Sequence, residues 1–302
     1  LYAITTGERN VAVGTNALAA LTAGGTANLG NVAIGYGALD SLQTGMSNIA
    51  IGVAAMDAAS GAISNCVCIG DRAGDAINDA AANGTIAIGY HALTELTTGT
   101  NNIAIGCNAA DAMDAGGANV VIGYDAFTTA TSENSNVVIG YESGKSMRHN
   151  SSDNNVFVGR QSSVGGTGSR VDSVAIGYRA WGNGGSANNI GGAENVFIGS
   201  LSGNGTWANA ASDGNTAIGY ATMTGAMDSA AGNVAVGTQA LAAVTDAHDN
   251  VAIGFQTMDA MQQGQDNVAI GRSAMGNANH ADADSNVVIG TYAGDGFGTN
   301  AV

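Results

Sequence analysis

The histidines and cysteines of this chain are its most recognisable candidates for metal or redox chemistry, but they are scattered. Cys66 and Cys68 lie two residues apart, so both would face the same way on an extended strand, and Cys107 lies too far along the chain for an easy disulfide. No histidine has metal-ligand spacing to a cysteine or to another histidine, so we expect no zinc site. The histidines are His91, His149, His248 and His280.

Short motifs that normally carry catalysis or ion binding are also missing or incomplete. Asp282 and Asp284 could bind calcium, but the repeated Gly-Gly-x-Gly-x-Asp phrase of calcium β-rolls is absent, so a solvated acidic turn is the better interpretation. The Gly-x-Gly-x-Gly run at 294–298 lacks the helix of a dinucleotide site, and no Gly-x-Ser-x-Gly elbow occurs. Stacking could bring distant aspartates together, although none is singled out. We predict no cofactor and no enzymatic activity.

The two tryptophans are the best candidates for contact with a ligand. Trp181 with Asn183, and Trp207 with Asn204, lie in the longest and least regular segments of the chain. Insertions in repetitive folds emerge as loops that often bind, and a sugar ring could stack on an exposed indole. The alternative is that the tryptophans cover the ends of longer coils.

The elements that must position these residues come from one phrase, Asn-Val-Ala-Ile-Gly or a close variant, which occurs sixteen times. Asn31, Ile34 and Gly35 belong to one copy, and Asn250, Ile253 and Gly254 to another. Successive phrase glycines are 17 to 22 residues apart. Such a period predicts an all-β parallel roll or solenoid of about sixteen coils. We expect a single repeat domain over 1–302, roughly 75 Å long at about 4.8 Å per coil.

Within the phrase, the residues flanking the central position are β-branched and indicate a short strand of about five residues. The residue before the glycine is always Ile or Val, and the residue three before it is Val or Ile in fifteen copies. The residue between them is Ala in ten copies and never polar, so both strand faces are apolar. A single thin roll offers nothing to bury a second face, and we therefore predict that another chain covers the alanine face.

The two ends of the phrase predict tight local structure. The leading residue is Asn in thirteen copies, which favours either a ladder of side-chain amide hydrogen bonds or an ordinary turn. The glycine indicates a positive φ or a close backbone approach. A frequent Leu-x-x-Leu spacing follows, as at Leu39 and Leu42. We favour extended return legs with tight turns, with short helical turns as the alternative.

Composition excludes several classes of partner. The net charge is −16 and Lys145 is the only lysine, which argues against nucleic acid and against anionic membrane surfaces. No apolar run reaches transmembrane length, so we expect no membrane insertion in this segment. The 47 glycines could suggest disorder, but 45% hydrophobic residues and the strict Ile/Val pattern oppose it. An acidic, lysine-poor surface fits an extracellular setting.

The repeated phrase resembles the head repeat of YadA-like trimeric autotransporter adhesins. The longer form at 31–39, with Thr44-Gly45 and the next phrase at 48–52, is also similar to repeats in tail-fibre and surface-fibre proteins of bacteriophages and bacteria. The adhesin repeat is shorter and more uniform. The resemblance implies a left-handed β-roll, three chains side by side and a role in attachment.

The leading functional hypothesis is therefore a structural and adhesive segment of a longer fibre protein, located outside the cell, on a cell surface or on a virion. Its partners would be further copies of itself, with a trimer implied by the resemblance, and a host-cell glycan or receptor. One alternative is a subunit of a self-assembling extracellular filament. Another is a polysaccharide-binding or polysaccharide-degrading solenoid with a groove near Trp181 and Trp207.

Overall fold

The computed structural model describes residues 9–21, 30–147, 152–165, 168–182, 192–207, 212–278 and 283–295. The chain divides into two compact units, unit 1 over Leu1–Lys145 and unit 2 over Ser146–Val302. Each unit is a β-solenoid of stacked parallel strands, which confirms the predicted all-β fold class. Within the described ranges the one helical element is the 3-10 turn η2 (Ala80–Ala82), and no helix has the length and apolarity to cross a membrane.

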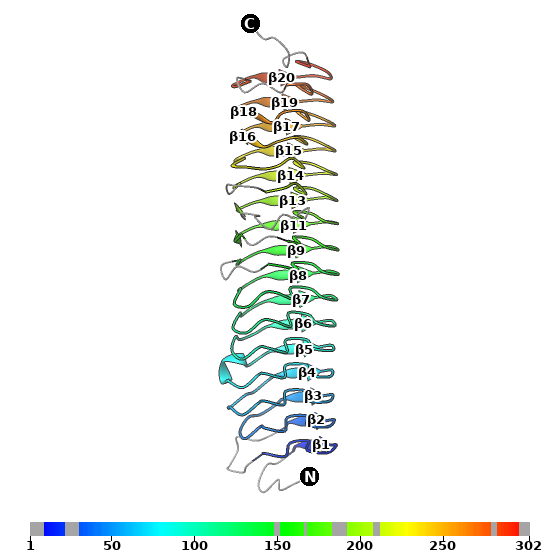
Figure 1. Ribbon diagram of the computed structural model, residues 1–302, viewed down its shortest axis with the longest axis vertical. Helices are drawn as coiled ribbons and strands as arrows, with labels where there is room; N and C mark the ends of the chain where they lie inside the picture. The colour runs from blue at the N-terminus through cyan, green and yellow to red at the C-terminus, as the bar shows by residue number, and fades with distance from the viewer. Residues whose placement is uncertain are drawn as a thin grey trace. The chain divides into compact units, whose positions relative to one another are not determined.

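Each of the sixteen phrases contributes one three-residue strand, eight to each unit, and Figure 1 shows them lying one above another within a unit. In unit 1 these are β1 (Val11–Val13), β2 (Val32–Ile34), β3 (Ile49–Ile51), β4 (Val67–Ile69), β5 (Ile86–Ile88), β6 (Ile103–Ile105), β7 (Val120–Ile122) and β8 (Val137–Ile139). In unit 2 they are β9 (Val156–Val158), β11 (Val174–Ile176), β13 (Val196–Ile198), β14 (Thr216–Ile218), β15 (Val234–Val236), β17 (Val251–Ile253), β19 (Val268–Ile270) and β20 (Val287–Ile289).

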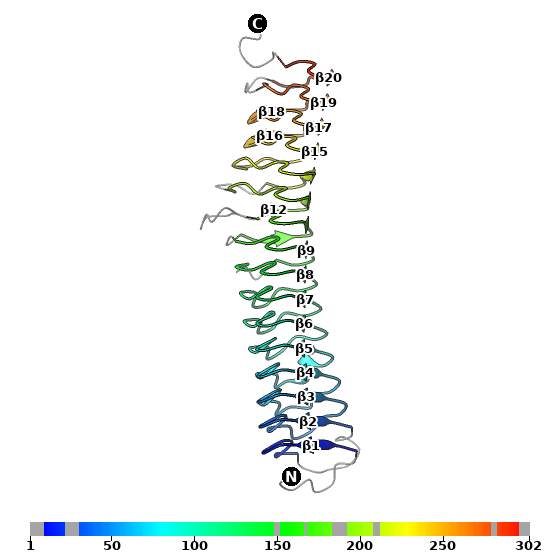
Figure 2. The same ribbon diagram turned by 90° about the vertical axis from the view of Figure 1, so that its right-hand side faces the viewer.

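Unit 2 also carries two smaller parallel ladders that the phrase did not predict. One pairs β10 (Arg170–Val171) with β12 (Gly192–Ala193), and the other pairs β16 (Asp246–His248) with β18 (Gln263–Gln265). Figure 2 shows β16 and β18 across the coil from β15, β17 and β19. The second ladder therefore forms part of the opposite wall of the same windings.

The main strands pair in register, so that equivalent phrase positions lie directly above one another. Val251 pairs with Val268, and Ile253 pairs with Ile270. The strands are shorter than the five residues predicted because the phrase glycine leaves the extended conformation, as at Gly254, where φ is +141°. Equal side chains therefore form continuous columns along each unit.

The structure reverses the predicted assignment of the two strand faces. The central residue points into the coil, and Ala33 and Ala252 are fully buried within a single chain. The flanking Ile and Val side chains point outward, and Ile253 is 38% exposed. Both faces are apolar, as predicted, but the expectation that a second chain covers the alanine face is wrong. The coil is thin, so in most windings only a small side chain fits between the strand and the return leg.

The return leg supplies the other half of the core through a chain of turns. Leu39 and Leu42 are fully buried, and Leu39 has a φ of +52°. Alternating left-handed residues keep the leg compact without a helix, so the predicted tight turns are present, but the prediction that the legs are extended is wrong. Volumes compensate across the coil. In one winding the strand carries the small Ala33 and the return leg carries the large Leu39. In another the strand carries Phe197 and the return leg carries Gly203, where an added Cβ would lie 2.6 Å from the Phe197 ring.

The phrase glycine meets both of the demands inferred from sequence, namely a positive φ and a close backbone approach. A Cβ at Gly254 would lie 2.5 Å from the Gly271 carbonyl oxygen of the next winding. The same contact recurs at Gly35 against Gly52, at 2.1 Å. Because real Cβ atoms do not approach a backbone oxygen so closely, only glycine permits the windings to stack at this point.

The substitution Gly254→Ala should destabilise the solenoid by about 3 kcal/mol, from the strained φ together with the clash. The matched control is Gly290→Ala, which has nearly the same φ, +134°, but whose added Cβ would meet, of the residues described, only the Ala293 Cβ at 3.5 Å. The control should lose only about 1–2 kcal/mol. Urea unfolding followed by circular dichroism would measure both, and equal losses would contradict the stacking clash.

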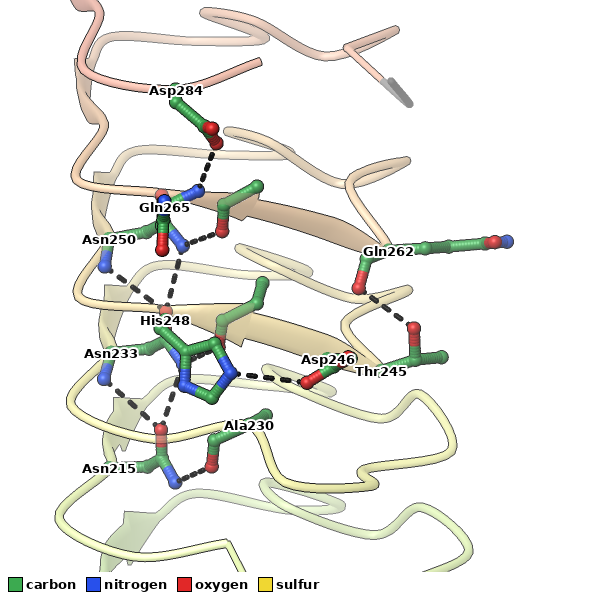
Figure 3. Close-up of polar contacts among 12 residues, drawn as sticks. Asn215, Ala230, Asn233, Thr245, Asp246, His248, Asn250, Gln262, Gln265 and Asp284 are labelled. Carbon is green, nitrogen blue, oxygen red and sulfur yellow. Dashed lines mark hydrogen bonds and ion pairs between the residues drawn. The ribbon is translucent and has the colours of Figure 1, made fainter. Parts of the chain in front are cut away.

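The phrase asparagines form a buried ladder, and this decides between the two interpretations of that position (Figure 3). Asn233 donates its Nδ2 to Asn215 Oδ1 at 3.0 Å and to the Ala247 carbonyl at 2.6 Å. Its own Oδ1 accepts from the backbone N and the Nδ2 of Asn250, at 3.1 and 3.0 Å. Each amide is therefore satisfied by neighbouring windings, which offsets the cost of burying it.

Replacing Asn233 with alanine should cost about 3 kcal/mol, because the buried donors of Asn250 lose their acceptor. Serine should cost less, since Ser173 already replaces asparagine in the chain and its Oγ accepts from the backbone N of Asn195 at 3.1 Å. The exposed Asn277→Ala is the control and should change stability by less than about 0.5 kcal/mol. Chemical denaturation would measure the free energy of unfolding of each variant. Equal losses for Asn233→Ala and Asn277→Ala would contradict the ladder.

Candidate functional site

The outward Ile and Val side chains of the main strands form an apolar strip along each unit. Its exposed members in unit 2 include Ile176, Ile218, Ile253 and Ile270, each between 36% and 38% exposed. Register pairing places these four residues in one column, at the position before the phrase glycine, and the first residues of the same strands form a second, parallel column. Contiguous apolar surface of this kind on a soluble protein marks an interaction site.

A column of aromatic residues borders the apolar strip where each strand ends. The residue after the phrase glycine is Tyr in six windings, and these side chains are between 41% and 60% exposed. Tyr124 and Tyr141 stack with ring centroids 5.4 Å apart and planes 9° from parallel. Arg160 adds a cation over the Tyr178 ring, 5.8 Å from its centroid. The tyrosines are Tyr36, Tyr90, Tyr124, Tyr141, Tyr178 and Tyr220.

The predicted ligand-contacting tryptophans lie in the core, so the expectation of exposed indole rings is wrong. Trp181 is 1% exposed and Trp207 is fully buried, with ring centroids 5.4 Å apart. Trp207 Nε1 donates to the Gly203 carbonyl oxygen at 3.2 Å. Asn204 is half-buried, and Asn183 lies outside the described residues. The missed signal was positional, because Trp181 follows its phrase glycine by four residues, as the core residue Leu39 does.

The buried Arg170 lies against this aromatic cluster. Its guanidinium is 4.8 Å from the Trp181 ring centroid, and its Nη2 donates to the Gly165 carbonyl oxygen at 2.7 Å. Burial lowers the pKa of Arg170 to about 10, so the side chain is still protonated at neutral pH. The cation–π contact and the carbonyl replace part of the hydration that the charge has lost. This arrangement supports the core and offers no open site.

Stacking does bring distant carboxylates together, which the sequence alone could not locate. Asp40, Asp57 and Asp75 occupy the same position in three successive windings of unit 1. Burial raises the pKa of Asp57, and the neighbouring Asp40 raises it further. Burial likewise raises the pKa of Asp75, with Asp57 adding to the effect. The column is a site of mutual repulsion rather than a catalytic pair in a pocket.

The remaining residues considered for metal chemistry stay apart in the structure. Cys66 and Cys68 are buried free thiols on the same inner face, and Cys107 is half-buried. Across the described ranges, no group of three or more His, Cys, Asp or Glu side chains has a geometry that could hold a metal ion. His248 lies on β16, and His149 and His280 lie outside the described residues.

Comparison with known proteins adds no family assignment: no protein family model and no curated protein matches this chain.

The carboxylate column predicts an unusual pH dependence of stability. A carboxyl whose pKa is raised by folding stabilises the fold when protonated, and this stability is lost as the pH rises through the folded-state pKa. The contribution of Asp57 should therefore increase as the pH falls from 7 towards 3.8. Asp57→Asn should raise the thermal midpoint at pH 7 and flatten this dependence, by an amount on the order of a few degrees. The exposed Asp71→Asn is the control, and a lower midpoint for Asp57→Asn would contradict the prediction.

Proposed function

We propose that this chain is a structural and adhesive segment of a fibre, placed outside the cell or on a virion, where it provides reach and stiffness for attachment. The observation that carries the proposal is the unbroken register of each unit, whose windings repeat the same glycine contact and the same asparagine bonds. Each winding is held by its neighbours over its whole circumference. Such a stack resists bending because any bend must break several ladders at once.

The apolar strip supports assembly with further copies of the chain. Eight strands spaced at about 4.8 Å make the strip of one unit roughly 35 Å long. Its Ile and Val columns carry no charge, and its repetition means that every copy offers the same surface to the next. Copies that pack strip to strip would bury these side chains and thicken the fibre. The resemblance to trimeric adhesin heads favours three chains.

The other hypotheses from the sequence have unequal support. A polysaccharide groove beside Trp181 and Trp207 loses its motivation, because both indoles are buried. A self-assembling filament would use the same stacking interactions along its axis, and it differs from a finite fibre segment in the length of the particles. We therefore retain the adhesive fibre segment as the function and leave the filament as an outcome of the test.

The association state tests this proposal. The chain at micromolar concentration should elute as an oligomer in light scattering, with a trimer expected, and electron micrographs should show rods of finite length. The double variant Ile253→Lys/Ile270→Lys places charges on the strip and should weaken association at least tenfold, about 1.4 kcal/mol, while the far-ultraviolet circular dichroism is preserved. Gln262→Lys, on an exposed residue away from the strip, is the control. A stable monomer of the unmodified chain would overturn the proposal, and unlimited polymers would favour the filament.

A further inference from the structure

Three successive windings of unit 2 present long polar side chains on the wall opposite the apolar strip. The windings carry Asp246-Ala247-His248 on β16, Gln263-Gly264-Gln265 on β18, and Ala283-Asp284 at the equivalent place in the next winding. Ala247, Gly264 and Ala283 are buried and alternate with the outward polar residues. Figure 3 shows Asp246, His248, Gln265 and Asp284 projecting from the same wall. We call this set of side chains the polar wall.

The polar wall surrounds an open depression of about 290 Å³, lined by Asp246, His248, Gln263, Gly264, Gln265 and Asp284. Register pairing places Asp246 beside Gln263 and His248 beside Gln265. His248 Nε2 lies 3.1 Å from Asp246 Oδ1, and Asp284 Oδ1 accepts from the backbone N of Gln265 at 2.9 Å. These two contacts hold the imidazole and one carboxylate in place at opposite ends of the depression.

At the position of Asp284, other windings carry Asn83, Asn134, Asp153 or Asp213, and the bond that Asp284 accepts from the preceding winding recurs at Asn83, Asn134 and Asp213. Both outward positions are short in several windings. Thr98 and Thr100 occupy them in one winding of unit 1, and Ala115 and Gly117 in the next. In unit 2, the winding before β16 has Ser229, Ala230 and Ala231 there, and Ala231 forms a bridge with His248. The contact made by Asp284 therefore belongs to the repeat. The local feature is the pairing of Asp246 with Gln263 and of His248 with Gln265 in adjacent windings.

The chemistry of the lining selects one class of ligand. Two carboxylates within a chain of net charge −16 disfavour an anion. Asp246 and Asp284 lie two windings apart, about 10 Å, which is too far for joint coordination of one metal ion. Among the described residues, the lining offers no apolar side chain for a hydrophobic ligand. Carboxylates accept hydrogen bonds from hydroxyl groups, and the side-chain amides of Gln263 and Gln265 both donate and accept hydrogen bonds. A neutral ligand rich in hydroxyl groups therefore matches the lining.

We propose that the polar wall binds a neutral sugar unit of a surface glycan, with Asp246 and Asp284 accepting from sugar hydroxyls and the amides of Gln263 and Gln265 bridging between them. The volume of the depression suits one or two sugar rings. This inference rests on the proposed adhesive function and names one place where attachment would occur. It needs no exposed indole, and binding at one such depression would be weak, so several copies in one fibre would act together.

Saturation-transfer NMR on the 302-residue chain tests the inference. The probes are the methyl glycosides of glucose, galactose, mannose and N-acetylglucosamine, with sialic acid as the anionic probe and glucosamine as the cationic one. At least one neutral glycoside should receive saturation, and its affinity should fall at least tenfold in Gln263→Ala/Gln265→Ala. That variant keeps the backbone bond from Gln265 to Asp284 and should fold normally. The control, Gln262→Ala/Asp266→Ala, changes exposed neighbours outside the depression and should bind as the unmodified chain does.

Three results would overturn the inference: no saturation of any neutral glycoside, a preference for sialic acid or glucosamine, or equal binding by the Gln263→Ala/Gln265→Ala variant. The association state and rod formation of the same samples report separately on the proposed fibre role. Oligomeric rods that bind no glycoside would contradict the sugar site but not the fibre role. A monomer that binds a glycoside would contradict the fibre role but not the sugar site.

Discussion

The backbone contact between phrase glycines of successive windings is the constraint on which the rest of the structure depends. A Cβ at Gly35, Gly106 or Gly254 would lie within 2.5 Å of a glycine carbonyl oxygen in the next winding. That contact keeps the windings at strand spacing where the chain turns out of the sheet. Once it is made, the strands pair in register, the asparagines reach one another, and equal side chains form columns. The columns of Ile, Val and Tyr that could serve assembly follow from this single close approach.

The interior shows how a fixed spacing limits side-chain volume. Ten windings place alanine at the central strand position and let Leu, Met or Trp fill the coil from the return leg, as Leu39 does against Ala33. Where the strand carries Phe197 the return leg carries Gly203, although the winding of Val121 holds the buried Phe127 at the same return-leg position. Close packing leaves little freedom, because a coil that is one side chain thick cannot relax around an extra methyl group.

The phrase predicted the solenoid and its parallel register, since both depend on the spacing of residues within one repeat. For the asparagine it left a ladder and an ordinary turn as alternatives, and the bonds between windings decide for the ladder. The assignment of faces failed because a strand that is apolar at every position shows that both faces avoid water without showing which face is inside. The pairing of Phe197 with Gly203 held that information, and the repeat position of Trp181 likewise marked it as core. The polar wall was missed, although counting back from the phrase glycine aligns Asp246 with Gln263, and His248 with Gln265 and Asp284. The phrase itself does not show that these positions face outward on the opposite wall.

The most direct test of the account is a comparison of one buried and one outward position on the same strand. Ala217 is fully buried and Ile218 is 38% exposed on β14. We expect Ala217→Asp to unfold unit 2 or to lower the urea midpoint severely, because a carboxylate would enter a closed core. Ile218→Asp should leave the monomer folded. Circular dichroism across a urea series would measure both variants. The reverse order, with Ile218→Asp the more damaging, would contradict the placement of alanine inside and of isoleucine outside.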